Sequence, residues 1–184
     1  NALNMSEYSG NANLMCLMSK VLSNYSGRVL EVFCGHNSYF VTKKGRTIVA
    51  LDYCRQSLTQ FSHKSAKRIC CDLNQVKSVG DLSFFDDESF DVISICFGYK
   101  YPDDIDILMS EFRRILKPDG ILSFIESYTH GYREIMQRTF DKDVIRKKLR
   151  SAGFFKVSVR PINQTPGKLR RRKEDLVYHA QAFK

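Results

Sequence analysis

Acidic side chains follow short apolar runs at several points in the first half of the chain. Glu31 lies within the first run, and Asp52 and Asp72 end the second and third. A tight turn at Gly35 comes directly after the first run. A carboxylate that ends a second strand can accept both hydrogen bonds of a ribose, and such a turn lets the backbone approach a ligand. The spacing favours a nucleotide-binding unit, and the alternative is an ordinary βαβ unit with a surface aspartate.

The elements that position these residues follow from the apolar pattern. Strands are predicted over residues 28–33, 46–51, 68–71, 90–96, 121–125, 154–159 and 176–183. Helices are predicted over residues 14–22, 38–43, 54–63, 105–116 and 144–152. The helix at 105–116 has the clearest apolar stripe, and Pro118 and Gly120 are expected to end it.

Five β/α alternations followed by two strands without an intervening helix predict the fold class. This order is typical of an α/β, Rossmann-like fold: a seven-stranded, mostly parallel sheet with helices on both faces and one antiparallel strand near the edge. Ligands bind at the carboxyl ends of strands in such sheets. We therefore expect Glu31, Asp52, Asp72 and the segment 96–99 to meet at one edge.

Length and composition are those of a single globular unit. The chain has 184 residues, of which 43% are hydrophobic and 27% charged. No apolar run approaches the roughly 20 residues that a membrane span needs, and no signal-peptide pattern is present, so a cytoplasmic protein is expected. We divide the chain into an N-terminal segment with a covering helix, residues 1–26, and a main domain, residues 27–184.

Cysteine and histidine spacing does not favour a metal site or a disulfide framework. None of the six cysteines forms a CxxC pair, and most lie inside apolar runs, so buried reduced thiols are predicted. The four histidines are scattered along the chain. We expect no metal.

Positive charge is concentrated in the last third of the chain. From residue 131 onward, 15 Lys and Arg residues stand against 5 Asp and Glu residues, whereas the whole chain has a net charge of +9. A loop between the last two predicted strands contains the densest cluster, Lys168, Arg170, Arg171, Arg172 and Lys173. Such clusters bind phosphates or carboxylates, so this loop could contact nucleic acid or another anionic surface. The alternative is a solvated loop.

The order of motifs along the chain resembles that of the class I S-adenosylmethionine-dependent methyltransferases. Residues 30–35 (LEVFCG) are similar to the first motif of that family, and Asp52 stands at its ribose-binding acid. Residues 71–73 (CDL) resemble the segment beside adenine, and residues 86–93 (DDESFDVI) resemble the lead-in to strand four. The most recognisable piece, residues 112–120 (FRRILKPDG), is similar to the helix end before strand five.

One subgroup is more similar still. Residues 93–99 (ISICFGY) resemble strand four of the ubiquinone/menaquinone C-methyltransferases, and residues 177–184 faintly resemble their final strand. This chain has Lys100-Tyr101 where that group has Arg-Asn, and it has the basic loop in addition. In the glycine-rich turn, Phe33 stands at the first glycine position, as in some RNA and DNA methyltransferases. The resemblance therefore implies the cofactor site but not a quinone substrate.

The resemblance implies S-adenosylmethionine as the cofactor and assigns roles to residues of this chain. Asp52 would bind the ribose, Asp72 the adenine amino group, and Tyr53 and Leu73 the ring. The remaining implied contacts, to the amino-acid end and the sulfonium, come from Glu31, Phe33, Cys34, Gly35, His36, Cys96 and Phe97.

Methyl transfer from a sulfonium is an in-line displacement that depends mainly on alignment. A base is needed only where the acceptor must lose a proton, and Tyr99 and His130 are the candidates. The residues expected to contact the substrate are Tyr99, Lys100, Lys168, Arg170, Arg171 and Arg172.

The function we expect is an S-adenosylmethionine-dependent methyltransferase acting on an anionic small molecule or a nucleic acid. Two alternatives stay open. The first is a quinone-type C-methyltransferase at a membrane surface, with the basic loop against anionic lipid. The second is a non-catalytic binding module that kept the fold.

Overall fold

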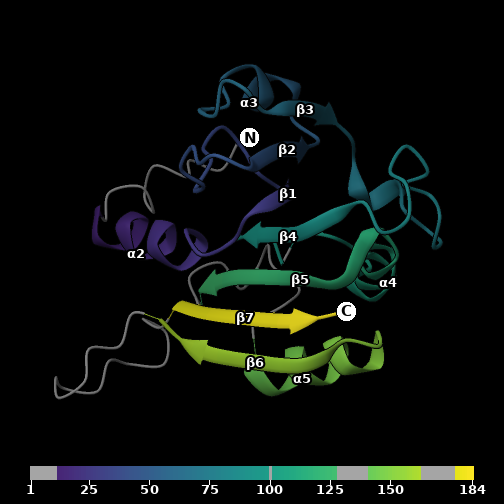
Figure 1. The fold of residues 1–184 in the computed structure, drawn as a ribbon. Helices are drawn as coiled ribbons and strands as arrows, with labels where there is room; N and C mark the ends of the chain where they lie inside the picture. The colour runs from purple at the N-terminus through teal and green to yellow at the C-terminus, as the bar shows by residue number, and fades with distance from the viewer. Residues whose placement is uncertain (1–11, 100, 128–140, 163–176) are drawn as a thin grey trace, which may run out of the picture.

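The computed structural model describes residues 12–99, 101–127, 141–162 and 177–184. One mixed sheet has the strand order β3-β2-β1-β4-β5-β7-β6 (Figure 1). Strands β1 to β5 are parallel, whereas β7 is antiparallel to both β5 and β6, which confirms the predicted sheet. The strands are β1 Gly27–Val32, β2 Arg46–Asp52, β3 Lys67–Cys70, β4 Phe90–Cys96, β5 Leu116–Ser127, β6 Phe155–Pro161 and β7 Val177–Phe183.

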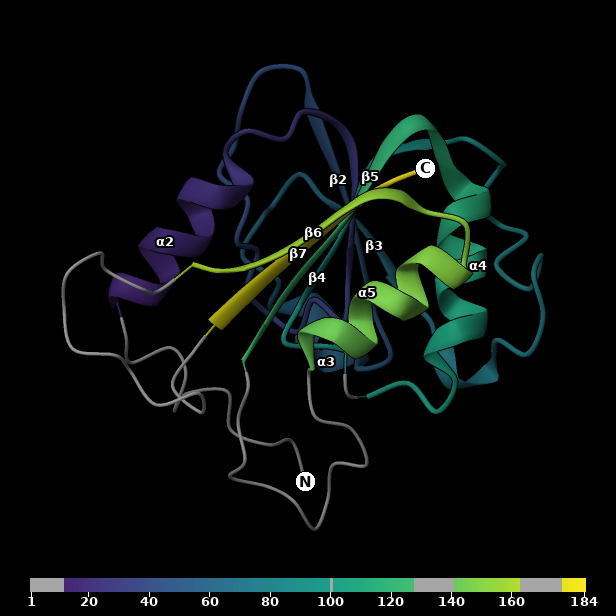
Figure 2. The same ribbon diagram turned by 90° about the horizontal axis from the view of Figure 1, so that it is seen from below.

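Helices lie on both faces of this sheet, as the sequence predicts. Figure 2 shows the sheet nearly edge-on, with α2 on one side and α4 and α5 on the other. The helical elements are α2 Ala12–Leu22, α3 Arg55–Thr59, the short 3₁₀ turn η1 Leu73–Gln75, α4 Ile105–Ile115 and α5 Lys142–Ser151. The side chains of Asp104 and Asp141 cap α4 and α5 by accepting backbone N–H groups of the first turn.

The sheet separates two apolar cores. Alternate residues of β1 face opposite sides, so Leu30 and Val32 pack with α4 and α5, whereas Val29 packs with Met18 and Leu22 of α2. All five side chains are almost fully buried. This packing fixes the strands whose carboxyl ends carry the acidic residues.

The helix predicted at residues 38–43 is absent, which corrects the sequence analysis. Residues 33–45 form turns, bends and irregular backbone between β1 and β2. The reason is local: the Ser38 hydroxyl and the Tyr39 N–H both donate to the Glu31 carboxylate. This arrangement places Phe40 in the core on the α2 side in place of a helix.

Two further boundaries differ from the prediction. The helix expected at 54–63 is limited to α3, after which the Ser62 N–H donates to the carbonyl of His36 instead of continuing a helix. Strand β5 begins at Leu116, directly after α4, because Leu116 pairs with Phe90 of β4. Pro118 and Gly120 therefore lie inside this strand, which was predicted only from residue 121.

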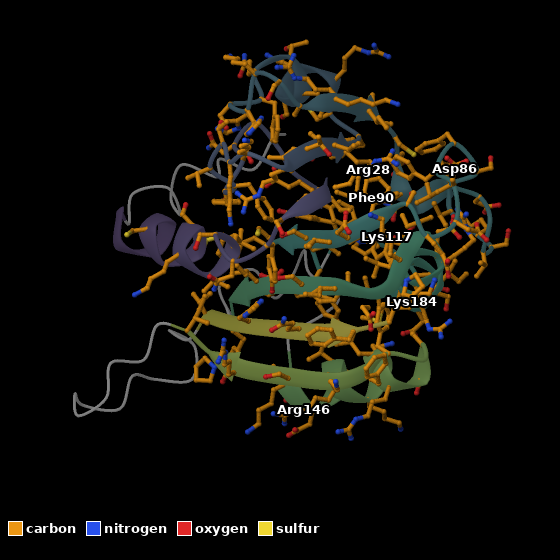
Figure 3. All side chains as sticks on the ribbon, in the orientation of Figure 1. Arg28, Asp86, Phe90, Lys117, Arg146 and Lys184 are labelled. Atoms are coloured by element: carbon orange, nitrogen blue, oxygen red, sulfur yellow. The ribbon has the colours of Figure 1, made fainter. Side chains whose placement is uncertain are left out.

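Charged side chains join the amino ends of the parallel strands. Asp91 accepts hydrogen bonds from the Arg28 backbone N–H at 2.7 Å and from Lys117 Nζ at 2.9 Å. The Arg28 guanidinium lies 4.5 Å from the centre of the Phe90 ring, and Lys184 Nζ donates to a β5 carbonyl at 2.7 Å. Figure 3 shows Arg28, Phe90, Lys117 and Lys184 together on this side of the molecule.

The cysteines are less buried than predicted. All six thiols are free, but only Cys96 is buried, and Cys16 and Cys70 are exposed. Within the described ranges, no three His, Cys, Asp or Glu side chains are grouped so that they could hold a metal ion. The same part of the chain contains no helix long and apolar enough to span a membrane.

Candidate cofactor-binding site

Asp52 joins the ends of β1 and β2. Its side chain is buried, with Oδ2 accepting the Gly35 N–H at 2.8 Å and Oδ1 accepting the Cys54 N–H at 2.8 Å. The N–H of Cys34 donates to the carbonyl of Leu51, which adds a backbone link between the same strands. A carboxylate has about four acceptor positions, so two hydrogen bonds leave capacity for a ligand.

The backbone at Gly35 is open on one side. Gly35 has a φ of +58°, and a Cβ atom built there would meet no heavy atom within 4 Å. A side chain at that position would occupy this space and strain the left-handed backbone. The turn therefore offers a bare stretch of backbone directly beside the Asp52 carboxylate.

Phe33 occupies the first position of this turn with a φ of +54°. Its side chain covers Gly98, where an added Cβ would lie only 2.7–2.9 Å from three Phe33 atoms. The Phe33 ring also lies 6.2 Å from the ring of Tyr101. Phe33 thus links the turn after β1 to the segment after β4, and Gly98 is required for that contact.

Glu31 organises the loop from inside the protein. Its side chain is 3% exposed, and its two oxygens accept from the Ser38 hydroxyl at 2.5 Å and the Tyr39 N–H at 3.3 Å. Burial raises the pKa of Glu31 to about 7. Glu31 is therefore a loop anchor, and both of its oxygens are already engaged.

The end of β4 closes the site from the other side. Cys96 is buried, and burial raises the pKa of its thiol, so the sulfur stays protonated at neutral pH. Phe97 has a φ of +57° and donates its N–H to the Ile125 carbonyl at 2.8 Å. The hollow between Glu31, Tyr39 and Cys96 measures about 10 Å³, which is room for one water molecule.

The end of β3 contributes mainly local structure. The Asp72 carboxylate accepts the Asn74 N–H at 3.0 Å and so caps η1. Leu73 is buried within that turn, whereas Tyr53, just after Asp52, is 70% exposed. Tyr53 thus presents a free aromatic surface next to the acidic end of β2, and His36 is exposed beyond Gly35.

Glu126 is a buried acid of this edge that the sequence analysis missed. It lies near the end of β5, is 2% exposed, and accepts the Tyr99 N–H at 3.2 Å. The sequence contains a pattern that indicates this residue, because Glu126 ends an apolar run as Asp52 does. Tyr99 itself is 3% exposed, with its ring edge-on to Phe124 at 6.0 Å.

The expected site residues therefore divide into two sets. Glu31, Gly35, Asp52 and the end of β4 lie at the carboxyl edge of the parallel strands, as does Asp72 after β3, and their roles in binding a ligand stay predictions. Several candidates for catalysis or substrate binding lie outside the described residues: Lys100, His130, Lys168, Arg170, Arg171 and Arg172.

This arrangement coincides with a known family. A family model described as a methyltransferase domain matches residues 30–124, which is more than half of the chain and runs from within β1 to within β5. The chain belongs to this methyltransferase family. The family is that of the class I S-adenosylmethionine-dependent methyltransferases, so the resemblance stated from the motifs is confirmed.

Curated relatives of this methyltransferase domain include quinone enzymes. The chain is 29% identical over 106 residues to a ubiquinone/menaquinone biosynthesis C-methyltransferase of Shewanella piezotolerans. That match covers 56% of this chain and 41% of the relative. The chain thus spans about two fifths of the length of that relative.

Solved structures show the same fold for nearly all of the chain. An S-adenosylmethionine-dependent methyltransferase from Archaeoglobus fulgidus superposes with a TM-score of 0.72 at 13% identity, covering 92% of this chain and 94% of that one. Phosphoethanolamine N-methyltransferase 2 of Haemonchus contortus gives 0.69 at 15% identity, covering 95% of this chain and 53% of that one. The latter was solved with phosphomonomethylethanolamine and S-adenosylhomocysteine.

S-adenosylmethionine is the cofactor of this methyltransferase family, and the adenosine side of the site fits it. Asp52 has free acceptor capacity beside the bare backbone of Gly35, and Tyr53 adds an exposed ring. The hollow lined by Glu31 and Cys96 has room for about one water molecule.

Proposed function

We propose that this chain binds S-adenosylmethionine at the carboxyl edge of the sheet and transfers its methyl group to an anionic acceptor. One observation carries the proposal: the Asp52 carboxylate accepts the Gly35 N–H at 2.8 Å beside an open turn. This hydrogen bond holds an acid that can bind the ribose diol, Asp52, directly beside the exposed backbone of Gly35. The matched family model supports the same conclusion.

The proposed roles follow from burial and exposure. Asp52 accepts the two ribose hydroxyls with its remaining lone pairs, as charge-assisted hydrogen bonds. Tyr53 covers one face of the adenine with its exposed ring, and Leu73 borders the ring from the core. Asp72, which already caps η1, keeps one oxygen for the adenine amino group.

At the other end of the site, mainly backbone groups contact the cofactor. The turn of Cys34, Gly35 and His36 binds the amino-acid end, with Phe33 beneath it and Glu31 holding the loop in shape. The carbonyls of Cys96 and Phe97 lie at the end of β4, where the sulfonium is expected. The bound cofactor supplies an electrophilic methyl group.

The chain's own residues act mainly by alignment. Methyl transfer requires the acceptor in line with the bond that breaks, and holding two reactants in that geometry supplies a large share of the rate. Glu126 fixes the Tyr99 backbone and so the segment that follows β4. Tyr99 and His130 remain the proposed groups for proton removal, where an acceptor needs it.

An anionic acceptor is proposed from the charge distribution. The last third of the chain carries the excess of Lys and Arg, including the loop from Lys168 to Lys173. A structural neighbour, phosphoethanolamine N-methyltransferase 2, holds a phosphate-bearing acceptor, which supports an anionic small molecule. The same cations, together with Tyr99 and Lys100, would serve a nucleic acid substrate.

A second candidate function is favoured by the curated relatives. These are ubiquinone/menaquinone biosynthesis C-methyltransferases, which favours a quinone-type acceptor reached at a membrane surface. A non-catalytic module is favoured by Phe33 at the first glycine position and by the narrow hollow beside Cys96.

Calorimetry with S-adenosylmethionine tests the cofactor step. We expect saturable binding in the micromolar range, and the absence of heat at high micromolar cofactor would contradict the enzyme and favour the non-catalytic module. Transfer of a radiolabelled methyl group to phosphobases, mixed RNA and a demethylated quinone then assigns the acceptor. RNA binding that does not weaken between 50 and 200 mM salt would exclude a phosphate-contacting loop, and equal recovery with neutral and anionic vesicles would exclude the membrane role.

A further inference from the structure

A second hollow lies away from the cofactor edge. It is a groove of about 440 Å³ between the end of α2 and the antiparallel strands β6 and β7. Figure 2 shows α2 beside this end of the sheet. Its strand residues His179 and Gln181 pair with Ile125 and Ser123 of β5, whereas Asp52 ends β2, on the other side of β1 and β4. The groove is therefore separate from the proposed cofactor site.

Two buried polar side chains that line this groove, Tyr25 and His179, form a cluster with the buried Ser123. His179 Nε2 lies 3.0 Å from Ser123 Oγ and 3.2 Å from the Tyr25 hydroxyl. All three side chains are less than a tenth exposed. Burial lowers the pKa of His179 to about 4, so the imidazole is neutral, and burial raises the pKa of Tyr25, so the phenol keeps its proton.

The neutral imidazole leaves one nitrogen for a ligand. Either the Ser123 or the Tyr25 hydroxyl can donate to the single lone pair of Nε2, and in that tautomer Nδ1 carries the ring proton. Nδ1 of His179 makes no hydrogen bond to any residue that the structure describes. In that tautomer His179, which lines the groove, carries a neutral N–H donor, and Asn24 and Gln181 line the groove as well.

The rim of the groove carries positive charge. Lys20 and Arg160 line it, and none of its lining residues in the described ranges is an Asp or a Glu. Neither cation forms an ion pair within the described part of the chain, whereas Lys117 and Lys148 are each paired with an aspartate. Besides the larger effect of burial, the charge of Arg160 lowers the pKa of both Tyr25 and His179, which places its guanidinium near these two side chains.

We propose that this groove binds the phosphoryl group of a small molecule, with Arg160 and Lys20 as its cationic contacts and His179 as a neutral donor. A guanidinium matches the geometry of two phosphoryl oxygens, and the phosphoryl oxygens can accept hydrogen bonds from the cations and from the neutral donors that line the groove. The volume lies within the range of small-molecule sites. The groove residues lie outside the proposed cofactor site, so phosphoryl binding here does not depend on the proposed methyl transfer.

Titration with inorganic phosphate tests the site at constant ionic strength. The ³¹P signal of phosphate and the ¹⁵N signal of His179 Nδ1 are followed in the wild-type chain, in Arg160→Gln and in Arg150→Gln. Arg150 is an exposed arginine of α5 outside the groove, so its variant is the matched control for lost charge. Thermal melts verify that the three proteins are equally folded, and saturating S-adenosylhomocysteine in a parallel titration separates the groove from the cofactor edge.

The expected result is saturable binding in the wild type and in Arg150→Gln, at least tenfold weaker binding in Arg160→Gln, and no change with S-adenosylhomocysteine. The His179 signal should move only in the two proteins that bind. Equal affinity in all three proteins, or a linear dependence on phosphate, would overturn the proposal. Adenosine monophosphate and a hexanucleotide, each with saturating S-adenosylhomocysteine, identify the source of the phosphoryl group. Sensitivity to Arg160→Gln supports the groove in either case, and binding of adenosine monophosphate that this substitution leaves unchanged counts against it.

Discussion

The backbone N–H of Gly35 donates to Oδ2 of Asp52 at 2.8 Å, across the boundary between β1 and β2. The second oxygen of the same carboxylate accepts the Cys54 N–H, so one side chain fixes the turn after β1 and the turn after β2. In the function proposed above, folding of this edge and binding of the ribose depend on the same two oxygens. This shared dependence makes Asp52 the most informative position to substitute.

Asp52→Asn should weaken S-adenosylmethionine binding at least tenfold and lower the free energy of unfolding by about 2 kcal/mol. The amide NH₂ would face either the Gly35 N–H or the Cys54 N–H, leaving a donor opposite a donor. Calorimetry and denaturant unfolding measure the two effects. Asp106→Asn, at an exposed aspartate of α4, is the control, and a cofactor affinity equal to that of this control would remove Asp52 from the site.

Gly98→Ala should destabilise the fold by about 1–3 kcal/mol, because the added methyl group would lie 2.7–2.9 Å from Phe33. The cost comes from overpacking, so it should depend on the phenylalanine ring. Denaturant midpoints of the single variants Gly98→Ala and Phe33→Ala give the two separate effects.

The double variant Phe33→Ala/Gly98→Ala decides whether the two residues are coupled. We expect it to be more stable than the sum of the single effects allows, by at least 0.5 kcal/mol. Strictly additive losses would show that Phe33 does not press on Gly98.

The buried Glu31 should make the wild-type protein less stable as the pH rises from about 4.5 to 7. Its pKa is about 7 in the fold and ordinarily 4.5, so in this interval the folded state binds more protons than the unfolded state. The stabilisation is complete below pH 4.5 and is lost as the pH passes the folded value. It amounts to about 3 kcal/mol at most.

Glu31→Gln removes this titration while keeping a hydrogen-bonding side chain of the same length. Thermal and denaturant unfolding across pH 4.5–7.5 should show a flatter profile for the variant than for the wild type. Asp86→Asn, at an exposed acid on the opposite side of the molecule, should leave the slope unchanged (Figure 3). Parallel profiles of the wild type and Glu31→Gln would contradict the raised pKa.

Arg46→Lys should loosen α2 from the sheet. The Arg46 guanidinium donates to the carbonyls of Leu22, Ser23 and Tyr25 at the end of α2 and to Val41 at 2.7 Å. A lysine cannot reproduce this planar fork, so a loss of about 2 kcal/mol is expected.

Amide hydrogen exchange measures the effect of Arg46→Lys where it should occur. Exchange in α2 should become faster relative to α4 and α5, which lie on the other face (Figure 2). Arg68→Lys, in the exposed edge strand β3, is the matched control. Unchanged protection of α2 would mean that packing alone holds the helix.

The sequence by itself determined the order of strands and helices along the chain and the acidic residues at the strand ends. Apolar runs ending at Asp52 and Cys96 are local patterns, because a strand buried on both faces must be apolar nearly throughout. The stripe of α4 and the acid at Asp104 likewise define that helix without long-range information. The fold class and the cofactor edge therefore followed from short stretches of chain.

Only the tertiary structure decided what each polar side chain contacts. Ser38 and Tyr39 donate to Glu31, and this contact replaces the helix that the local pattern favoured. Phe33 needs Gly98 beneath it, and His179 needs Tyr25 from a segment 154 residues away. Contacts of this kind, whether 7 residues apart as for Ser38 and Glu31 or 154 apart as for Tyr25 and His179, depend on the folded path of the chain. Neither periodicity nor spacing can therefore reveal them, and burial then sets whether each group is charged.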